Sequence, residues 1–306
     1  MDSQNSTSEK IDVYEMVTNR IIELMEAGTV PWRKPWTDKG IPMNAISKRP
    51  YGGINIMLLN SYDFPSNHFL TWNQIKECGG SVLKGEKGTF VVFTKITEKE
   101  VEKNGSMEKE KKSILRYYKV FNIEQCKDLP ADLMPKEEGA IEPLIECYSI
   151  VETMKNPPKI IHKKADAFYV PSEDYINMPK RKSFKSIEDY YGVLFHELIH
   201  ATGHQTRLAR KEVCESPSFG SELYSHEELV AEMGACYLRS YAGLPIADMS
   251  NNASYIKGWL GVFKGDKKVL IKAASQSQKA VEYILNPKVK EEIIPVDQLE
   301  VESEMV

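Results

Sequence analysis

The sequence predicts an α+β protein of two parts, a small α+β unit followed by a mainly helical unit with a small β-sheet. The chain has 306 residues, more than most single domains hold. Candidate strands gather within residues 81–125, whereas helical periodicity dominates after residue 185. Residues 128–144, with three prolines and an acidic patch, separate the two parts. We therefore expect a first domain over residues 1–135 and a second over residues 136–306.

The first unit opens with an amphipathic helix at residues 10–27, in which apolar side chains recur at helical spacing until Gly28. The next segment, VPWRKPW at residues 30–36, contains two prolines, which exclude a regular helix. A Gly-Gly turn then leads into a short apolar helix within residues 50–60. Residues 71–80 predict a helix that is capped by a threonine and stopped by glycine.

Strands follow these helices. Residues 81–96 predict two strands around a glycine-containing turn, and residues 114–125 predict another strand and turn. Residues 98–113 between them are almost all charged and contain an Asn-Gly turn. We interpret this stretch as a solvated hairpin tip or a mobile loop.

The second unit begins with a predicted helix at residues 144–155, and residues 164–179 predict the strands of its small sheet. Helical periodicity then predicts four helices, at residues 185–203, 225–243, 252–263 and 266–285. The first two of these end at glycine, as helices often do.

Histidine is scarce and clustered, since four of the six histidines fall within residues 196–226. Residues 196–200 read HELIH, an H-E-x-x-H pattern. On a helix His196 and His200 share one face, so both imidazoles can bind one Zn²⁺. Glu197 stands beside them as a general base for a water molecule. The pattern predicts zinc-dependent hydrolysis of a protein or peptide substrate.

A catalytic zinc needs a third protein ligand, and the sequence offers three candidates. His204 lies one turn beyond His200, but Gly203 is expected to end the helix before it. Glu228 and Glu232 share a face of the next helix. A second helix that brings glutamate to H-E-x-x-H resembles the gluzincin metallopeptidases. That resemblance implies Glu228 as the ligand and Glu232 as the carboxylate that supports a ligand histidine; Glu232 or His204 as the ligand stays open.

The residue that would stabilise the oxyanion is not fixed by the sequence. The candidates are His226, Tyr169, Tyr191 and Tyr255. The strand-like segment DAFYVP could bind an extended peptide along a sheet edge, with an ordinary core strand as the alternative.

The formal net charge of -4 gives no sign of a nucleic-acid partner for the whole chain, but residues 28–97 carry nine Lys and Arg against four Asp and Glu. Aromatic residues alternate with these cations. Single-stranded DNA suits such a surface because phosphates meet cations and bases stack on rings. The alternative is that the tryptophans belong to the core and the cations are solvated. The candidate DNA-binding residues are Trp32, Arg33, Lys34, Trp36, Lys48, Arg49, Tyr51, Trp72, Lys84, Lys87 and Tyr118.

The first residues are polar and acidic, without the basic-then-apolar profile of a signal peptide. No apolar run reaches the roughly 18 residues of a membrane span. We therefore expect a cytoplasmic protein without a membrane partner.

Several motifs in the same order resemble the ArdC-type antirestriction proteins. The N-terminal part of the likeness is carried by VPWRKPW, YGGIN, LTWNQIKECGGSVLKGEKGTFVVF and YYKVFNIEQC, and the C-terminal part by HELIHATGHQTRLAR and EELVAEMGACYL. The resemblance implies a single-stranded-DNA-binding N-terminal domain joined to a zincin-like metallopeptidase domain, carried on mobile genetic elements. It further implies protection of incoming DNA from host restriction. A DNA-binding protector without proteolysis, whose metal site is structural, is the alternative.

Overall fold

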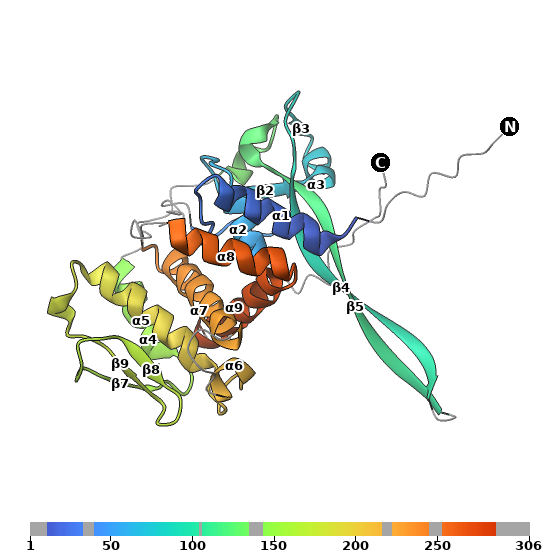
Figure 1. The fold of residues 1–306 in the computed structure, drawn as a ribbon. Coiled ribbons are helices and arrows are strands. Elements are labelled where there is room, and N and C mark those ends of the chain that lie inside the picture. Colours follow the sequence, from blue (N-terminus) through green and yellow to red (C-terminus); the bar gives the residue numbers. More distant parts are fainter. Residues whose placement is uncertain are drawn as a thin grey trace.

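The computed structural model describes residues 11–32, 40–103, 106–134, 143–215, 222–244 and 253–285 (Figure 1). Within them the protein is α+β, as the sequence predicted: helices combine with small sheets in both parts of the chain. None of the described helices has both the length and the hydropathy needed to cross a bilayer.

The first sheet has the strand order β1-β2-β5-β4. Its strands are β1 (Met43–Asn44), β2 (His68–Thr71), β4 (Thr89–Lys103) and β5 (Ser106–Asn122). β1 and β2 are parallel, and the other neighbours are antiparallel. β4 and β5 continue beyond the sheet as a long hairpin that projects from the body of the molecule (Figure 1). This arrangement confirms the hairpin interpretation of residues 98–113 over the loop interpretation.

The rest of the first part surrounds this sheet. The additional elements are α2 (Ile54–Asn60), α3 (Trp72–Glu77), β3 (Ser81–Val82), η1 (Ile123–Gln125), β6 (Cys126–Lys127) and η2 (Ala131–Leu133). Thr71 caps α3 as predicted, because its side chain accepts a hydrogen bond from the Gln74 backbone. The two strands expected within residues 81–96 do not pair with each other: β3 pairs with β6, and β4 pairs with β5.

The second part places a three-stranded sheet beside a group of helices. Its elements are α4 (Pro143–Thr153), β7 (Lys159–Ile161), β8 (Phe168–Val170), β9 (Tyr175–Asn177), η3 (Arg181–Ser183), α5 (Ile187–Thr202), α6 (Lys211–Cys214), α7 (Glu222–Tyr241), α8 (Ala253–Gly265) and α9 (Val269–Leu285). The sheet order β7-β9-β8 leaves β8 at an edge, antiparallel to β9. α7 packs against both α5 and α9 (Figure 1).

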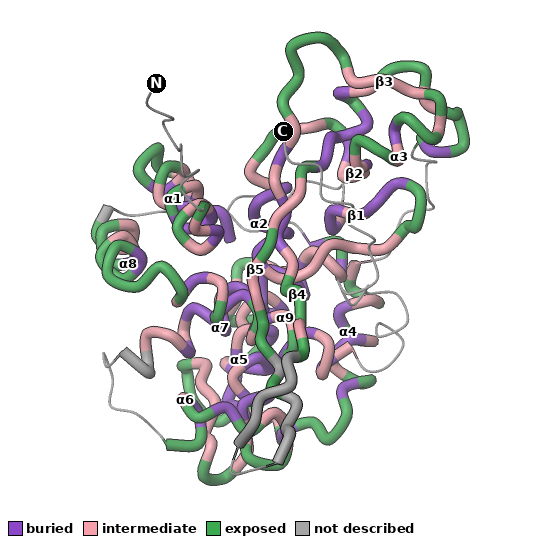
Figure 2. The backbone as a smooth tube through the Cα atoms, turned by 90° about the vertical axis from the view of Figure 1, so that its right-hand side faces the viewer, coloured by how far each residue is buried: buried purple, intermediate pink, exposed green. Residues whose placement is uncertain are grey.

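Helix α1 (Val13–Glu26) comes from the start of the chain but packs on the second part. It lies along α8 in both views (Figures 1 and 2), and its buried residues join the same core as those of α5, α7 and α9. Lys267 stabilises this contact. Its carbonyl accepts a hydrogen bond from Thr18 Oγ1 at 2.8 Å, and its Nζ forms an ion pair with Asp12 Oδ2 at 2.6 Å. The predicted domain boundary at residue 135 lies outside the described residues. The largest core cluster contains buried residues from both sides of it, whereas two smaller clusters belong to the first part.

Candidate metal centre

Helices α5 and α7 supply the side chains of the predicted metal site. His196 and His200 lie one turn apart on α5, with ring centroids 4.7 Å apart. α7 approaches closely here because Gly234 has no side chain: a Cβ at that position would lie 2.6 Å from Ile199 Cδ1. This approach lets Glu228 of α7 reach the two imidazoles of α5.

The imidazoles of His196 and His200 and the carboxylate of Glu228 lie close enough together to bind the same metal ion. His196 Nε2 and His200 Nε2 are 3.1 Å apart, and the Glu228 carboxylate oxygens lie 3.6 Å and 3.5 Å from these two nitrogens. Ligands of one tetrahedral ion, each at about 2.0–2.2 Å from it, stand about 3.3 Å from one another. His196, His200 and Glu228 can therefore hold a single metal ion without rearrangement.

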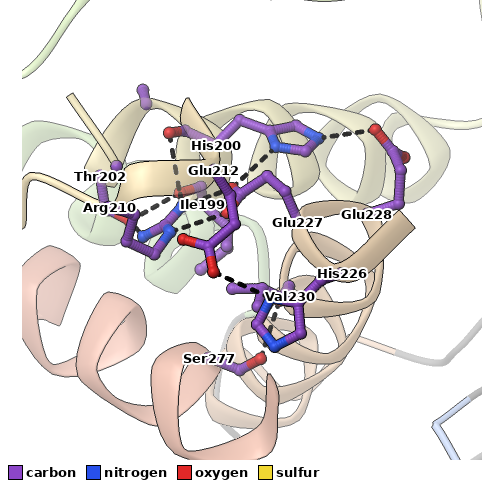
Figure 3. A network of polar contacts seen from close by, with 12 residues as sticks. Ile199, His200, Thr202, Arg210, Glu212, His226, Glu227, Glu228, Val230 and Ser277 are labelled. Carbon is purple, nitrogen blue, oxygen red and sulfur yellow. Dashed lines mark hydrogen bonds and ion pairs between the residues drawn. The ribbon is translucent and has the colours of Figure 1, made fainter. Parts of the chain in front are cut away.

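A buried carboxylate fixes the orientation of one ligand. His200 Nδ1 donates to Glu227 Oε1 at 3.1 Å, which leaves Nε2 facing Glu228 (Figure 3). Burial alone would raise the pKa of Glu227, but hydrogen bonds from His200 and Arg210 hold this pKa below its usual range. Glu227 is therefore the charged acceptor that keeps the His200 proton on Nδ1.

Arg210 in turn fixes Glu227. Its Nε donates to Glu227 Oε2 at 2.9 Å and one terminal nitrogen donates to Oε1 at 2.6 Å, so both carboxylate oxygens are held (Figure 3). The same guanidinium also donates to Thr202 Oγ1 at 2.6 Å and to the Ile199 carbonyl at 2.7 Å, both on α5. Arg210 is 6% exposed and Glu227 is 5% exposed. A buried ion pair thus joins the end of α5 to α7 behind the ligands.

The predicted role of Glu232 requires a correction. The carboxylate that supports His200 is Glu227, whereas Glu232 accepts hydrogen bonds from Trp32 Nε1, at 2.9 Å, and from the Tyr255 hydroxyl. The sequence analysis placed the supporting carboxylate one helical turn after Glu228, at Glu232, and therefore missed Glu227, the residue directly before Glu228. Adjacent residues lie about 100° apart around a helix, so Glu227 and Glu228 reach the two different nitrogens of one imidazole.

The catalytic candidate Glu197 lies next to the ligands on α5 and is 7% exposed. In the part of the chain that the structure describes, its carboxylate has no hydrogen-bond or ion-pair partner. A carboxylate without such a partner is available to accept a proton. His204 does not join the group: it lies beyond Gly203, and its Nδ1 contacts Thr206 Oγ1 at 2.8 Å.

The four candidates for oxyanion stabilisation are dispersed. Tyr169 donates to Asp174 at 2.9 Å, and Tyr191 is buried in the core. His226 lies 3.4 Å from Glu212 and faces away from Glu228, because residues two apart on a helix point in nearly opposite directions (Figure 3). Tyr255, whose hydroxyl donates to Glu232, contacts the face of α7 that also carries Glu228.

The structure also corrects one predicted DNA contact. Trp32 is 1% exposed, packs edge-on against Trp259 and Phe263, and donates to Glu232. A ring in this position cannot stack on a base, so the core alternative holds for Trp32. Three other predicted contacts, Arg33, Lys34 and Trp36, lie outside the described residues.

The remaining predicted DNA contacts lie on the surface of the first part or in a cavity. Trp72 is 44% exposed, with Lys76 Nζ 5.3 Å from its ring centroid. Lys48, Lys84 and Lys87 are exposed. The structure brings the other three together, since Arg49, Tyr51 and Tyr118 line one cavity of about 560 Å³ beside α9.

The H-E-x-x-H helix, the glutamate from a second helix and the adjoining small sheet define a protein with a zincin-like metallopeptidase domain. Residues 151–276 match the family model of that description, "Zincin-like metallopeptidase". Residues 11–121 match the N-terminal domain of the anti-restriction factor ArdC.

The chain belongs to the ArdC family of antirestriction proteins. The metal-free crystal structure of ArdC from plasmid R388 is 35% identical, with a TM-score of 0.72, and the match covers 92% of this chain and 99% of that one. The Mn(II)-bound structure of the same protein is 36% identical, with a TM-score of 0.68, over 90% and 97% of the two chains. The family resemblance seen in the sequence is thereby confirmed.

Two curated relatives extend the comparison. Protein y4eC of Sinorhizobium fredii is 30% identical, over 93% of this chain and 95% of its own length. DNA primase TraC of Escherichia coli is 33% identical over 89% of this chain, but the match spans only 20% of the primase. Most of the primase therefore has no counterpart here.

Proposed function

We propose that this protein binds single-stranded DNA and hydrolyses a host protein at a zinc centre formed by His196, His200 and Glu228. The observation that carries the proposal is that these three donors lie 3.1–3.6 Å from one another, beside the buried Glu197, which has no hydrogen-bond or ion-pair partner among the residues that the structure describes. The match of residues 151–276 to a metallopeptidase family model supports the proposed hydrolysis of a protein.

Each residue of the site has a separate role in the proposed hydrolysis of an amide bond. A divalent ion held by His196, His200 and Glu228 would supply a Lewis acid for the scissile carbonyl and would lower the pKa of water. Glu197 accepts the proton of the attacking water and passes it to the leaving amine. Glu227 and Arg210 hold His200 in the orientation that binding requires.

We assign zinc to this site because two imidazoles and one carboxylate form an established ligand set for catalytic zinc. The Mn(II)-bound structure of the R388 protein makes manganese the competing ion. Competition titration of the metal-free protein with Zn²⁺ and Mn²⁺ tests the assignment. Zinc should bind the more tightly, as its place in the affinity order of divalent ions predicts, and tighter binding of manganese would contradict the assignment.

The peptide is proposed to lie along β8. This strand is at the edge of its sheet and packs against α5, so an extended chain paired with it would run beside the metal site. The DNA is proposed to lie on the first part of the chain, where Trp72, Arg49 and the exposed lysines offer a ring for stacking and cations for phosphate.

A Glu197→Gln variant tests the peptidase proposal. The substitution keeps the size of the side chain and leaves the three ligands intact, so metal content should stay at the wild-type level. Protection of an incoming plasmid should fail in a host that restricts it, and cleavage of host protein should stop. Full protection by this variant with its metal still bound would favour the non-proteolytic protector instead.

A further inference from the structure

A cavity of about 560 Å³ lies away from the metal site, between the first part of the chain and helix α9. Strands β4 and β5 pass beside α9 in both views (Figures 1 and 2). The first part contributes Arg49, Tyr51, Phe93 and Tyr118 to its walls, and α9 contributes Gln278 and Lys279. Its volume falls in the range of about 300–1,000 Å³ that is typical of small-molecule sites.

Hydrogen bonds within the first part of the chain and between the two parts hold the walls of this cavity in place. Gly53 donates its N–H to Gln278 Oε1 at 2.9 Å, and its carbonyl accepts from the Tyr237 hydroxyl at 3.0 Å. The side chain of Asn55 bonds to both the N–H and the carbonyl of Val92, at 2.7 Å and 2.8 Å. The cavity is therefore preformed and belongs to both parts.

Aromatic rings dominate one side of the cavity. Phe93 and Tyr118 are in contact, with centroids 5.8 Å apart and a tilt of 60°. Burial raises the pKa of Tyr118 to about 12, and that of Tyr51 further, so both phenols are neutral, and they are hydrogen-bonded to each other. Neutral rings of this kind suit a flat heterocycle that carries hydrogen-bonding groups on its edge.

Two cations line the same cavity from different parts of the chain. Arg49 comes from the first part and Lys279 from α9, and neither forms an ion pair with any residue that the structure describes. The acidic residue in the lining, Glu282, accepts a hydrogen bond from Gln278 Nε2 at 3.3 Å. An anion that bridges Arg49 and Lys279, as a phosphate can, would satisfy both charges.

We propose that this cavity takes one nucleotide of a bound DNA single strand, with its base against Tyr51, Phe93 and Tyr118 and a phosphate between Arg49 and Lys279. The inference rests on the proposed binding of single-stranded DNA. It extends the DNA site beyond the N-terminal part of the chain, onto a helix that packs against the ligand-bearing α7.

The test is a Lys279→Ala variant of the full chain, with Lys272→Ala as the matched control. Both lysines are exposed on α9, but Lys272 does not line the cavity. Affinity for a labelled oligothymidylate, measured by fluorescence anisotropy over a range of salt concentrations, should fall about three- to tenfold for Lys279→Ala. The slope of log affinity against log salt should become shallower by about 0.7, the contribution of one phosphate contact on a single strand. Equal curves for the two variants would overturn the inference.

A second variant tests the aromatic wall. Phe93→Ala should weaken binding about 5- to 150-fold, the usual loss when one stacking ring is removed, while thermal unfolding and metal content show that the protein is folded. Unchanged binding would overturn the placement of the base. Competition with thymidine 5′-monophosphate distinguishes binding of a DNA strand from binding of a free nucleotide. If the mononucleotide bound as tightly as the oligothymidylate, the proposal of a bound strand would be overturned. If the wild-type protein binds no single strand at all, the proposed function fails as well.

Discussion

Glu227 Oε1 lies 3.1 Å from His200 Nδ1, and this hydrogen bond turns the other ring nitrogen of His200 toward Glu228. The two adjacent glutamates of α7 thus act on opposite sides of one imidazole. Glu228 offers a carboxylate oxygen to the metal position, and Glu227 fixes the orientation of His200, the second ligand at that position.

The first prediction concerns Glu227. Replacing it with glutamine removes the charged acceptor for His200 Nδ1–H, so affinity for Zn²⁺ should fall about 10- to 100-fold. Isothermal titration of the metal-free protein with Zn²⁺ measures this change. Glu212→Gln is the control, because Glu212 contacts His226 rather than a ligand. The assigned role of Glu227 would be wrong if the two variants bound zinc equally well.

The metal site shows what sequence spacing can and cannot predict. Because residues four apart lie on the same face of any α-helix, the motif alone predicts that His196 and His200 are neighbours, independently of the rest of the fold. The choice between Glu227 and Glu232 depends on the side from which α7 approaches α5, which Gly234 helps to set. No local pattern encodes that approach.

The second prediction concerns the buried ion pair between Arg210 and Glu227. Arg210→Met leaves a buried carboxylate without its main partner and should lower the free energy of unfolding by about 3–5 kcal/mol. The double variant Arg210→Met/Glu227→Leu removes both charges and should be more stable than the single variant. Urea unfolding of the metal-free proteins measures both effects. A double variant less stable than Arg210→Met would contradict this account.

The third prediction contrasts two tryptophans that the sequence analysis grouped together. Trp32 lies in the core beside Trp259 and Phe263, so Trp32→Ala should lower the free energy of unfolding by about 3–5 kcal/mol. Trp72 is 44% exposed, with its ring against Phe121, so Trp72→Ala should lower the free energy of unfolding by only about 1 kcal/mol and should instead weaken binding of single-stranded DNA. Chemical denaturation and anisotropy titrations on both variants measure the contrast. Equal losses of stability would contradict the placement of the two rings.

The environment of Trp32 explains why its burial was not predicted from the sequence. Its hydrogen-bond partners, Glu232 and Tyr255, lie 200 and 223 residues further along the chain. The local sequence shows only a tryptophan among prolines and cations, which suits an exposed segment equally well. By contrast, the caps of α1 and α3 are local signals, and those helices follow the expected ranges.

The fourth prediction concerns acid stability and the pair formed by Asp174 and Arg207. Burial alone would raise the pKa of Asp174, but hydrogen bonds from Arg207, at 2.8 Å to each carboxylate oxygen, and from Tyr169 hold it below its ordinary value. A carboxyl group with a lowered pKa in the folded state contributes stability that is present above about pH 4 and is lost as the pH falls through the folded value.

The wild-type protein should therefore lose more stability between pH 5 and pH 3 than Asp174→Asn does, since the asparagine has no proton to gain. Urea midpoints measured at several pH values over about pH 3–7 give this comparison. Asp63→Asn serves as the control for the change from Asp to Asn, because Asp63 is exposed and forms no ion pair with any residue that the structure describes. Parallel pH curves for the wild type and Asp174→Asn would show that the ion pair does not contribute to acid stability.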